Sequence, residues 1–258
     1  MSARRILVLG GTHEARLVAG ALDASGVPVT SSLATRTASA RLPAGDVRMG
    51  GFGGHEGLAA WITAHNVAAV LDATHPFAER IAGSAARACA ATGTSLLRLE
   101  RPGWTQQPDD RWHWVDDLPQ AAAAIAPLGT RVLLTTGRQG LSAFASTASA
   151  WFLVRCIEPP DPPLPPRHQL LLDRGPYAVE GELALIDEHR LDLVVTKDSG
   201  GDHTAAKLEA ARRRSLPVLI VRRPPRPAAT TVFTVEAAVD WAREQMDAGR
   251  RSERVHGR

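Results

Sequence analysis

Short apolar runs alternate with longer amphipathic segments along most of the chain. Runs rich in Val, Ile and Leu are typical of strands buried in a parallel sheet. The intervening segments carry apolar residues at helical spacing, and helix-ending residues such as Gly bound them. In the first part of the chain this pattern predicts strands at 5–9, 27–33, 46–49, 67–71 and 95–99, and helices at 13–25, 56–66 and 78–91.

The alternation pauses at residues 100–117 and then resumes. This segment carries three tryptophans among Pro, Gln and Asp residues and predicts a linker with one antiparallel strand. The tryptophans are expected to pack in a core or hinge, although they could stack on a flat ligand. Beyond it, the pattern predicts helices at 118–126, 179–189, 205–214 and 236–248, and strands at 131–135, 151–157, 191–196 and 217–221. Six prolines within 158–166 predict an extended loop.

Repeated strand–helix alternation predicts an α/β fold with parallel sheets and right-handed crossovers. We expect two Rossmann-like parallel-sheet lobes with the active site in the cleft between them. The expected boundaries are a cofactor-binding lobe at 1–99, a linker at 100–117, a second, substrate-binding lobe at 118–248 and a disordered charged tail at 249–258.

Composition narrows the class of protein. Of 258 residues, 44% are hydrophobic and 22% charged, as in a soluble globular protein, and we expect no membrane span. The N-terminus leads into a strand rather than a signal peptide, and Cys89 and Cys156 show no disulfide or metal spacing, so we expect a cytoplasmic protein without a metal. A net charge of +3 does not require nucleic acid. A monomer is compatible with these features.

The first strand ends in a glycine turn. Gly10 and Ala15 match the first and last positions of the dinucleotide fingerprint G-x-G-x-x-G/A, and Thr12 replaces the middle glycine. The following helix offers its N-terminal N–H groups to a phosphate. We therefore expect Gly10, Gly11 and Thr12 to bind a pyrophosphate, with Thr12 either donating a hydroxyl hydrogen bond or capping the helix.

The second strand indicates which dinucleotide is bound. A free ribose 2′-hydroxyl usually meets an Asp or Glu about 20 residues after the glycines. No acidic residue lies between Val27 and Arg41, and the strand instead ends in Thr35, Arg36 and Thr37. An arginine suits a 2′-phosphate, which predicts NADPH rather than NADH. A solvated surface role for Arg36 is the alternative.

Two further loops follow strands of the first lobe. Four glycines lie within Gly50 to Gly54, and we expect Gly51 and Gly53 to approach the cofactor, with a flexible turn as the alternative. After the fourth strand come Asp72-Ala73-Thr74-His75-Pro76-Phe77-Ala78. Because ligands of open α/β sheets bind at the carboxyl ends of strands, we expect Thr74, His75, Pro76 and Phe77 to contact the nicotinamide end.

The second lobe has two strand-end loops that combine a cation with hydroxyls and glycines. They are Thr135-Thr136-Gly137-Arg138 and Thr196-Lys197-Asp198-Ser199-Gly200-Gly201. Neither matches the P-loop pattern, but each could hold a carboxylate or phosphate. We expect Thr136, Gly137, Arg138, Lys197, Asp198, Ser199, Gly200 and His203 to bind an anionic substrate.

Several other chemistries are disfavoured. Tyr177 is followed four residues later by Gly181, so the Tyr-x-x-x-Lys pair of short-chain dehydrogenases and sugar-nucleotide epimerases is absent. The nine histidines show no metal-ligand spacing, and no G-x-S-x-G nucleophile elbow occurs.

Five segments together resemble the precorrin-6A reductase family of cobalamin (vitamin B12) biosynthesis. They are Ile6-Leu7-Val8-Leu9-Gly10-Gly11-Thr12, Asp72 to Ala78, Arg101-Pro102, Thr136-Gly137-Arg138 and Thr196 to Gly201. The similarity runs from about residue 4 to about residue 245. The strings D-A-T-H-P-F-A and T-K-D-S-G-G are specific to this family, whereas the opening glycine turn also occurs in other proteins. The proline run at 159–166 has no matching role in the family.

The resemblance implies NADPH-dependent reduction of one double bond of the precorrin-6A macrocycle, which gives precorrin-6B. The substrate would carry acetate and propionate groups, which gives the cations of the second lobe a chemical reason. If a side chain donates a proton, Asp72, His75 and Asp198 are the candidates. The alternatives are an NADPH-dependent reductase of another polycarboxylate and a non-catalytic NADP-binding sensor. Whether the ring is metal-free or contains cobalt stays open at this point.

Overall fold

Two units make up the chain, and each is described by itself. The computed structural model describes residues 3–34 and 42–256. Unit 1 comprises Met1–Arg101 and Pro225–Arg258, and unit 2 comprises Pro102–Pro224. The chain therefore leaves unit 1 once and returns to it.

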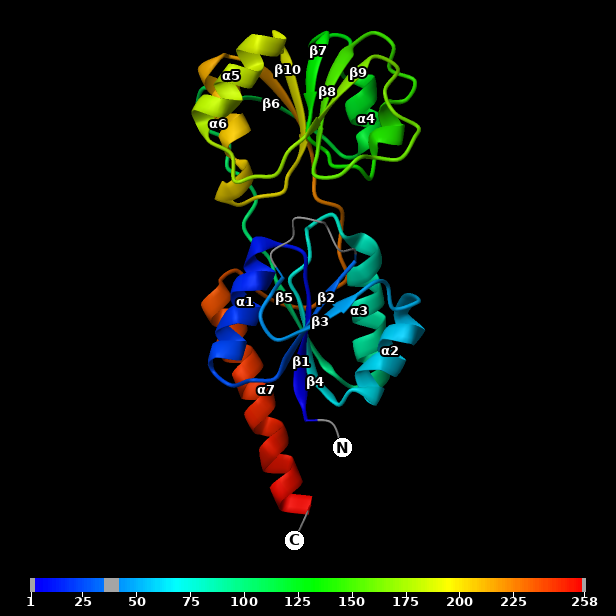
Figure 1. The fold of residues 1–258 in the computed structure, drawn as a ribbon, viewed down its shortest axis with the longest axis vertical. Coiled ribbons are helices and arrows are strands. Elements are labelled where there is room, and N and C mark those ends of the chain that lie inside the picture. Colours follow the sequence, from blue (N-terminus) through cyan, green and yellow to red (C-terminus); the bar gives the residue numbers. More distant parts are fainter. Residues whose placement is uncertain (1–2, 35–41, 257–258) are drawn as a thin grey trace. The chain divides into compact units, whose positions relative to one another are not determined.

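Unit 1 is built on a parallel sheet with the strand order β3-β2-β1-β4-β5-β12. Its strands are β1 (Arg5–Leu9), β2 (Val29–Leu33), β3 (Asp46–Met49), β4 (Val67–Asp72), β5 (Ser95–Leu99) and β12 (Thr230–Val232). Its helices are α1 (His13–Ala24), α2 (Gly54–Ala64), α3 (Glu79–Thr92) and α7 (Val235–His256). Figure 1 shows α1 and α7 on one side of this sheet and α2 and α3 on the other. The strand order reverses between β1 and β4, which is where doubly wound sheets bind their ligands.

Alternate side chains of the unit 1 strands face two separate cores. Ile6 and Val8 pack in a cluster with residues of α1 and α7, whereas Leu7 and Leu9 pack in a cluster with residues of α2 and α3. Both faces of the sheet are therefore covered by helices, which explains why the central strands β1 and β4 are nearly continuous apolar runs rather than alternating ones.

Unit 2 has a second parallel sheet, with the order β9-β8-β7-β10-β11-β6. Its strands are β6 (Arg111–Val115), β7 (Arg131–Leu134), β8 (Trp151–Cys156), β9 (His168–Leu172), β10 (Leu193–Lys197) and β11 (Pro217–Val221). Its helices are α4 (Leu118–Ala123), α5 (Val179–His189) and α6 (Ala206–Arg213), with short 3₁₀ turns η1 (Leu141–Phe144) and η2 (Asp202–Thr204). Trp104, Trp112 and Trp114 pack against its core, as expected.

The two sheets share one spatial plan. In each sheet, three strands lie on one side of the reversal point and three lie on the other. The central pair is β1 and β4 in unit 1, and β7 and β10 in unit 2. The outer neighbour of β5 is β12, which follows the return of the chain to unit 1. The outer neighbour of β11 is β6, which follows the first passage of the chain into unit 2. The predicted class of two Rossmann-like parallel-sheet lobes is confirmed.

The structure corrects the linker prediction. Residues 111–115 form β6, which pairs in parallel with β11 from Pro217↔Arg111 to Val221↔Val115. The segment is therefore an edge strand of unit 2 rather than an antiparallel strand of a linker. Its tryptophans pack on the apolar core of unit 2, which holds the segment in the sheet.

The predicted domain boundaries also differ from the structure at the C-terminal end. The sequence pattern predicts the last helix as part of the second lobe, but Ala238, Ala242 and Met246 of α7 pack in the core of unit 1. Two strands, β9 and β12, were not predicted; β12 is short, and β9 is an edge strand with exposed leucines. The tail expected to be disordered continues α7 as far as His256.

No helix within residues 3–34 and 42–256 is both long and apolar enough to cross a bilayer.

Candidate cofactor and substrate site

The glycine turn and the β4 motif meet at the reversal point of unit 1. Leu9 of β1 pairs with Asp72 of β4, and Ala73 N donates to Leu9 O at 3.0 Å. On the other side, Gly10 N donates to Ser32 O of β2 at 3.0 Å. Two stretches that are far apart in sequence therefore open onto the same edge of the sheet, as the sequence predicted.

The backbone of the glycine turn suits a phosphate. Gly11 has φ 114° and is exposed, and a Cβ built on it would have no atom within 4 Å. A positive φ favours glycine, and the open space lies in front of the N-terminus of α1, where N–H groups lack intrahelical partners. A Cβ on Gly10 would touch the Ala15 Cβ at 3.4 Å, which explains the small residues at both fingerprint positions.

Thr12 joins the two halves of this site. Its hydroxyl donates to Ala73 O at 2.8 Å and accepts from Ala15 N at 3.1 Å, which makes it the N-cap of α1. Because the hydroxyl proton is used on Ala73, the geometry favours the capping role over donation to a phosphate.

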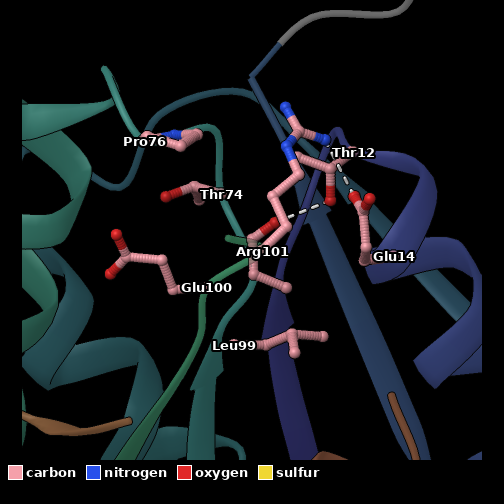
Figure 2. A pocket seen from close by; sticks show the side chains of 8 residues that line it. Thr12, Glu14, Thr74, Pro76, Leu99, Glu100 and Arg101 are labelled. Carbon is pink, nitrogen blue, oxygen red and sulfur yellow. Dashed lines mark hydrogen bonds and ion pairs between the residues drawn. The ribbon is translucent and has the colours of Figure 1, made fainter. Parts of the chain in front are cut away.

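A pocket lies at the carboxyl ends of β1, β4 and β5 (Figure 2). It is lined by Thr12, Glu14, Ala73, Thr74, Pro76, Leu99, Glu100 and Arg101. An ion pair of 3.0 Å between Arg101 Nη1 and Glu14 Oε2 closes one side of it. Sequence reasoning singled out Arg101 only as part of a family motif and did not single out Glu14.

Opposing effects act on the charge of Glu14. Burial would raise the pKa of its carboxyl, but a backbone hydrogen bond and the Arg101 guanidinium outweigh burial and hold the pKa below its ordinary value. The pocket therefore contains a charged pair. Its cation, Arg101, is the last residue of unit 1 before the chain enters unit 2.

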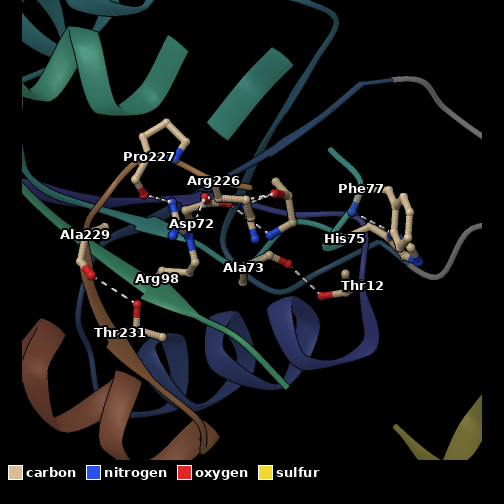
Figure 3. Close-up of polar contacts among 11 residues, drawn as sticks. Thr12, Asp72, Ala73, His75, Phe77, Arg98, Arg226, Pro227, Ala229 and Thr231 are labelled. Carbon is tan, nitrogen blue, oxygen red and sulfur yellow. Dashed lines mark hydrogen bonds and ion pairs between the residues drawn. The ribbon is translucent and has the colours of Figure 1, made fainter. Parts of the chain in front are cut away.

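Asp72 is buried in a network of two arginines (Figure 3). Its Oδ2 accepts from Arg226 Nη2 at 2.7 Å and lies 3.6 Å from Arg98 Nε. Its Oδ1 accepts from the Thr74 hydroxyl at 2.6 Å and from Thr74 N at 3.2 Å. With both oxygens occupied and no exposure to solvent, Asp72 is placed as an anchor of the strand end rather than as a proton donor.

The Thr74 hydroxyl is oriented by the same network. It donates to Asp72 and accepts from Arg226 Nη2 at 3.1 Å, so it has no second proton to offer a cofactor. A contact between Thr74 and a nicotinamide would therefore involve its backbone or methyl group.

His75, Pro76 and Phe77 form a turn before α3. Phe77 N donates to His75 Nδ1 at 3.2 Å, and Ala78 N donates to His75 O at 2.8 Å. Because Nδ1 accepts this bond, a neutral His75 ring carries its proton on Nε2. Pro76 is buried and lines the pocket, whereas His75 is half-buried.

The other predicted cofactor residues divide into two groups. Thr35, Arg36 and Thr37 lie outside the described residues. The Gly50–Gly54 loop follows β3, with Gly53 at φ 81° as the N-cap of α2. Arg48, which the sequence reading did not single out, donates to the carbonyls of Gly50 and Gly51.

In unit 2, the two predicted anion-binding loops are neighbours. Thr136 to Arg138 follow β7, Lys197 ends β10, and these strands pair at the reversal point of their sheet. Lys197 Nζ lies 3.4 Å from Gln139 O, which links the loops directly. Arg138 is exposed and pairs with Glu158 at 3.3 Å, and Gly137 has φ 76°.

Asp198 resembles Asp72 in its surroundings. It is buried, its Oδ1 accepts from Trp104 N at 3.2 Å, and its Oδ2 pairs with Arg223 Nε at 3.1 Å. A Cβ on Gly200 would lie 2.2 Å from Pro102 O, so this glycine allows the loop to pack on residue 102. The geometry favours an anchoring role for Asp198.

Three other predicted substrate residues have less distinctive surroundings. The Thr136 hydroxyl is buried without a hydrogen-bond partner among the described residues. The Ser199 hydroxyl lies 3.4 Å from Lys197 O. His203 belongs to η2, and its side chain lies outside what is described.

The residues missed by sequence reasoning are mostly arginines. Arg98, Arg101 and Arg226 contact acidic residues far away in the sequence, whereas Arg48 contacts the carbonyls of the adjacent glycine loop. Arg101 had a signal, since it belongs to a quoted motif. Arg226 had none, because it lies in a proline-rich stretch without periodicity. Within the described part of the chain, no group of three or more His, Cys, Asp or Glu side chains could hold a metal ion.

Comparisons with known proteins agree with this geometry. Residues 5–243 match the family model described as Precorrin-6x reductase CbiJ/CobK. A relative from Rhodococcus erythropolis named Precorrin-6A reductase is 54% identical over 92% of this chain and 96% of its own length. One from Priestia megaterium named Cobalt-precorrin-6A reductase is 29% identical over 91% of this chain and 96% of its own length.

A solved structure agrees as well. The structure titled CobK precorrin-6A reductase superimposes with a TM-score of 0.88 at 40% identity, and covers 95% of this chain and 97% of its own. The match extends over both units and both groups of strand-end loops. The chain belongs to the Precorrin-6x reductase CbiJ/CobK family.

Proposed function

We propose that this protein reduces one ring double bond of precorrin-6A with NADPH, to give precorrin-6B in cobalamin biosynthesis. The observation that carries the proposal is the open glycine turn at the reversal point of a Rossmann-like sheet, in a chain of this reductase family. The turn supports dinucleotide binding, and the family supports the substrate.

NADPH supplies a hydride, and the ring takes up one further proton, so the product gains two hydrogen atoms. Gly10 and Gly11 would bind the pyrophosphate through backbone N–H groups in front of α1. Thr12 would hold the turn against Ala73 rather than bind phosphate itself. Arg36 and its neighbours Thr35 and Thr37 would bind the 2′-phosphate.

The turn from Thr74 to Phe77 would position the nicotinamide end. Pro76 lines the pocket, and the Asp72 network fixes the strand end from which the turn departs. The main contribution of the protein is then to hold donor and acceptor carbons in reacting geometry.

We assign the role of proton donor to none of the three candidates, and we assign His75 a positioning role. Asp72 and Asp198 are buried carboxylates: Asp72 accepts a hydrogen bond from Arg226, and Asp198 forms an ion pair with Arg223. His75 uses Nδ1 to order the turn through Phe77 N. A conjugated, iminium-like ring can accept hydride without a strong protein acid, and solvent can supply the proton.

Unit 2 would bind the peripheral carboxylates of the substrate. Lys197 and Arg138 belong to adjacent loops, which also carry Thr136, Gly137, Ser199 and Gly200. His203 is part of the same proposal. A cluster of cations among glycine N–H groups suits several acetate and propionate groups at once.

The relatives named for precorrin-6A and for cobalt-precorrin-6A differ in how similar their sequences are to this chain. The Rhodococcus relative, named for precorrin-6A, is 54% identical, and the Priestia relative, named for the cobalt-containing form, is 29% identical. This difference supports the metal-free ring as substrate.

The test is to mix the protein with precorrin-6A and NADPH that carries deuterium at the transferable position. We expect one NADPH oxidised per ring reduced and deuterium in the product. NADPH binding without turnover of either form of the ring would instead indicate a sensor, and turnover of a different polycarboxylate would indicate another reductase.

A second arm tests the role of unit 2. Lys197→Ala should raise KM for precorrin-6A without changing NADPH affinity, whereas Arg167→Ala, which removes an exposed cation before β9, should change neither. Unchanged turnover in Lys197→Ala would contradict the assignment of the substrate loops.

A further inference from the structure

Arg48 lies where the ribose end of a bound dinucleotide would lie. It is next to last in β3 and pairs in register with Ser32 of β2, which in turn pairs with Leu9 of β1. Neighbouring strands are about 4.8 Å apart, so Arg48 lies roughly 10 Å from the end of β1. The ribose 2′ substituent of a Rossmann-bound dinucleotide is read at the end of β2, between these positions.

The glycine loop holds the Arg48 guanidinium in place. Nη1 donates to Gly50 O at 2.5 Å and lies 3.4 Å from Ser32 Oγ, and Nη2 donates to Gly51 O at 2.7 Å. The guanidinium carbon lies 3.7 Å from the centre of the Phe52 ring. These contacts fix the plane of the group before any ligand arrives, which reduces the ordering cost of binding.

The charge of Arg48 has no carboxylate among its contacts in the described part of the chain. Burial lowers the pKa of its guanidinium, which is the direction expected when a cation is partly removed from water. Arg5 offers a contrast at the opposite end of the same strands, where its Nη1 donates to Asp46 at 2.8 Å and to Thr30. Arg5 is therefore neutralised by a carboxylate, whereas Arg48 is preordered and has no anion beside it among the described residues.

Arg48 also has donors to spare. A guanidinium has five N–H groups, and the contacts to Gly50, Gly51 and Ser32 occupy three of them. Within residues 3–34 and 42–256, Nε–H and one proton of Nη2 have no acceptor. These two donors are adjacent on the group and match the paired oxygens of a phosphate.

We propose that Arg48 binds the 2′-phosphate of NADPH and thereby helps the protein to select NADPH over NADH. This inference rests on the proposed function and adds to it a specificity residue that lies outside the Thr35–Arg36–Thr37 segment. It also gives the Gly50–Gly54 loop a task, which is to orient a cation rather than to touch the cofactor itself.

Removal of a charged hydrogen bond of this kind weakens binding roughly ten- to hundredfold. Arg48→Ala should therefore raise the Kd for NADPH at least about tenfold and leave the Kd for NADH nearly unchanged. Arg48→Lys keeps the charge but loses the fork geometry, so it should retain part of the preference.

Isothermal titration calorimetry of the full chain tests this without turnover. The ligands are NADPH, NADH, 2′,5′-ADP and 5′-AMP, and the proteins are wild type, Arg48→Ala, Arg48→Lys and the control Arg5→Ala. We expect wild type and Arg5→Ala to prefer 2′,5′-ADP over 5′-AMP, and Arg48→Ala to lose most of that preference. Thermal melting of each variant checks that it is folded, and Arg48→Lys carries the test if Arg48→Ala is not.

Two outcomes would overturn the inference and can be told apart. In the first outcome, wild type prefers NADPH, but Arg48→Ala loses affinity equally for NADPH and NADH or loses none for either. Arg48 would then only support the loop, and the proposed function would stand. No preference for NADPH in wild type would overturn both the role of Arg48 and the cofactor half of the proposed function.

Discussion

Arg226 donates a 2.7 Å hydrogen bond to the buried carboxylate of Asp72, although 154 residues separate them in the chain. Arg226 lies just after the return of the chain to unit 1, and Asp72 lies at the end of β4. The conformation of the motif after β4 therefore depends on a residue that follows the whole of unit 2. Because Arg226 also contacts Thr74, the bond sets where the His75–Phe77 turn begins.

Arg226→Ala should destabilise the fold strongly. It removes one partner of a nearly fully buried ion pair and leaves Arg98, at 3.6 Å, as the remaining cation beside Asp72 among the described residues. Loss of one partner of such a pair costs about 3–5 kcal/mol, and Arg98 should hold the effect near the lower end. The measurement is the free energy of unfolding in urea. Arg243→Ala, which breaks an exposed pair with Asp240, should cost less than about 1 kcal/mol, and equal effects of the two variants would refute the anchoring role.

Substitutions of His75 should separate positioning from proton donation. In His75→Asn, the amide oxygen can take the place of Nδ1 and accept from Phe77 N, but no group replaces the Nε2 proton. We expect His75→Asn to keep kcat within about tenfold of wild type and His75→Ala to lose more, with a raised KM for NADPH. If His75 donated the proton, both variants would lose roughly 10²–10⁴-fold in kcat.

Thr12→Val should weaken both stability and NADPH binding. The substitution keeps the shape of the side chain but removes the cap of α1 and the bond to Ala73 O. Loss of an N-cap typically costs about 1 kcal/mol, and the glycine turn loses its link to β4. Thr12→Ser keeps both hydrogen bonds and should behave like wild type in thermal melting and in NADPH titration. A Thr12→Val protein with unchanged Kd would show that the link to β4 does not shape the turn.

Gly200→Ala should destabilise the protein, whereas Gly83→Ala should not. Gly200 has φ 65°, and an added Cβ would lie 2.2 Å from Pro102 O. Backbone strain alone costs roughly 1–2 kcal/mol, and the backbone contact adds to it. Gly83 lies inside α3 with open space around it, where alanine is favoured by roughly 0.5–1 kcal/mol. The comparison is made by urea unfolding, and a neutral Gly200→Ala would contradict the close approach of the loop.

The buried thiols should be unreactive in the native protein. Burial, with a smaller effect of the nearby Asp72 charge, raises the pKa of Cys89 from 9.0 to about 12, and burial also raises the pKa of Cys156. At pH 8 neither thiol forms a reactive thiolate, so iodoacetamide should label both cysteines only after denaturation. The raised pKa of Cys89 contributes stability that is complete below about pH 9 and is lost as the pH rises towards 12. Rapid labelling of Cys89 in folded protein at pH 8 would contradict its burial.

Much of the site could be predicted because the relevant physics is local. A strand that ends in Gly10-Gly11-Thr12 and one that ends in Asp72-Ala73-Thr74 are recognisable from apolar runs and turn residues alone. Parallel topology then requires their carboxyl ends to share an edge of the sheet. The same reasoning placed Thr136 to Arg138 and Lys197 on neighbouring loops of unit 2, which the structure confirms.

The roles of the two motif aspartates could not be predicted in this way. Asp72 and Asp198 were candidate acids because they follow strands, but each is buried against an arginine from the segment that leads back into unit 1. An ion pair between residues so distant in the chain leaves no periodic trace in the sequence. Arg48 was missed for a different reason, since its neighbours are loop carbonyls that any sequence supplies.

The sequence by itself determined the α/β class, most helices and strands, and the loops at the two reversal points, because hydrophobic periodicity and turn residues act over short distances. The tertiary structure alone decided that β6 and β12 fill the sixth place of each sheet, that α7 packs on unit 1, and that Arg226 holds Asp72. Those outcomes depend on which apolar faces and buried charges find each other across the folded chain, and such pairings are set by packing and desolvation rather than by local pattern.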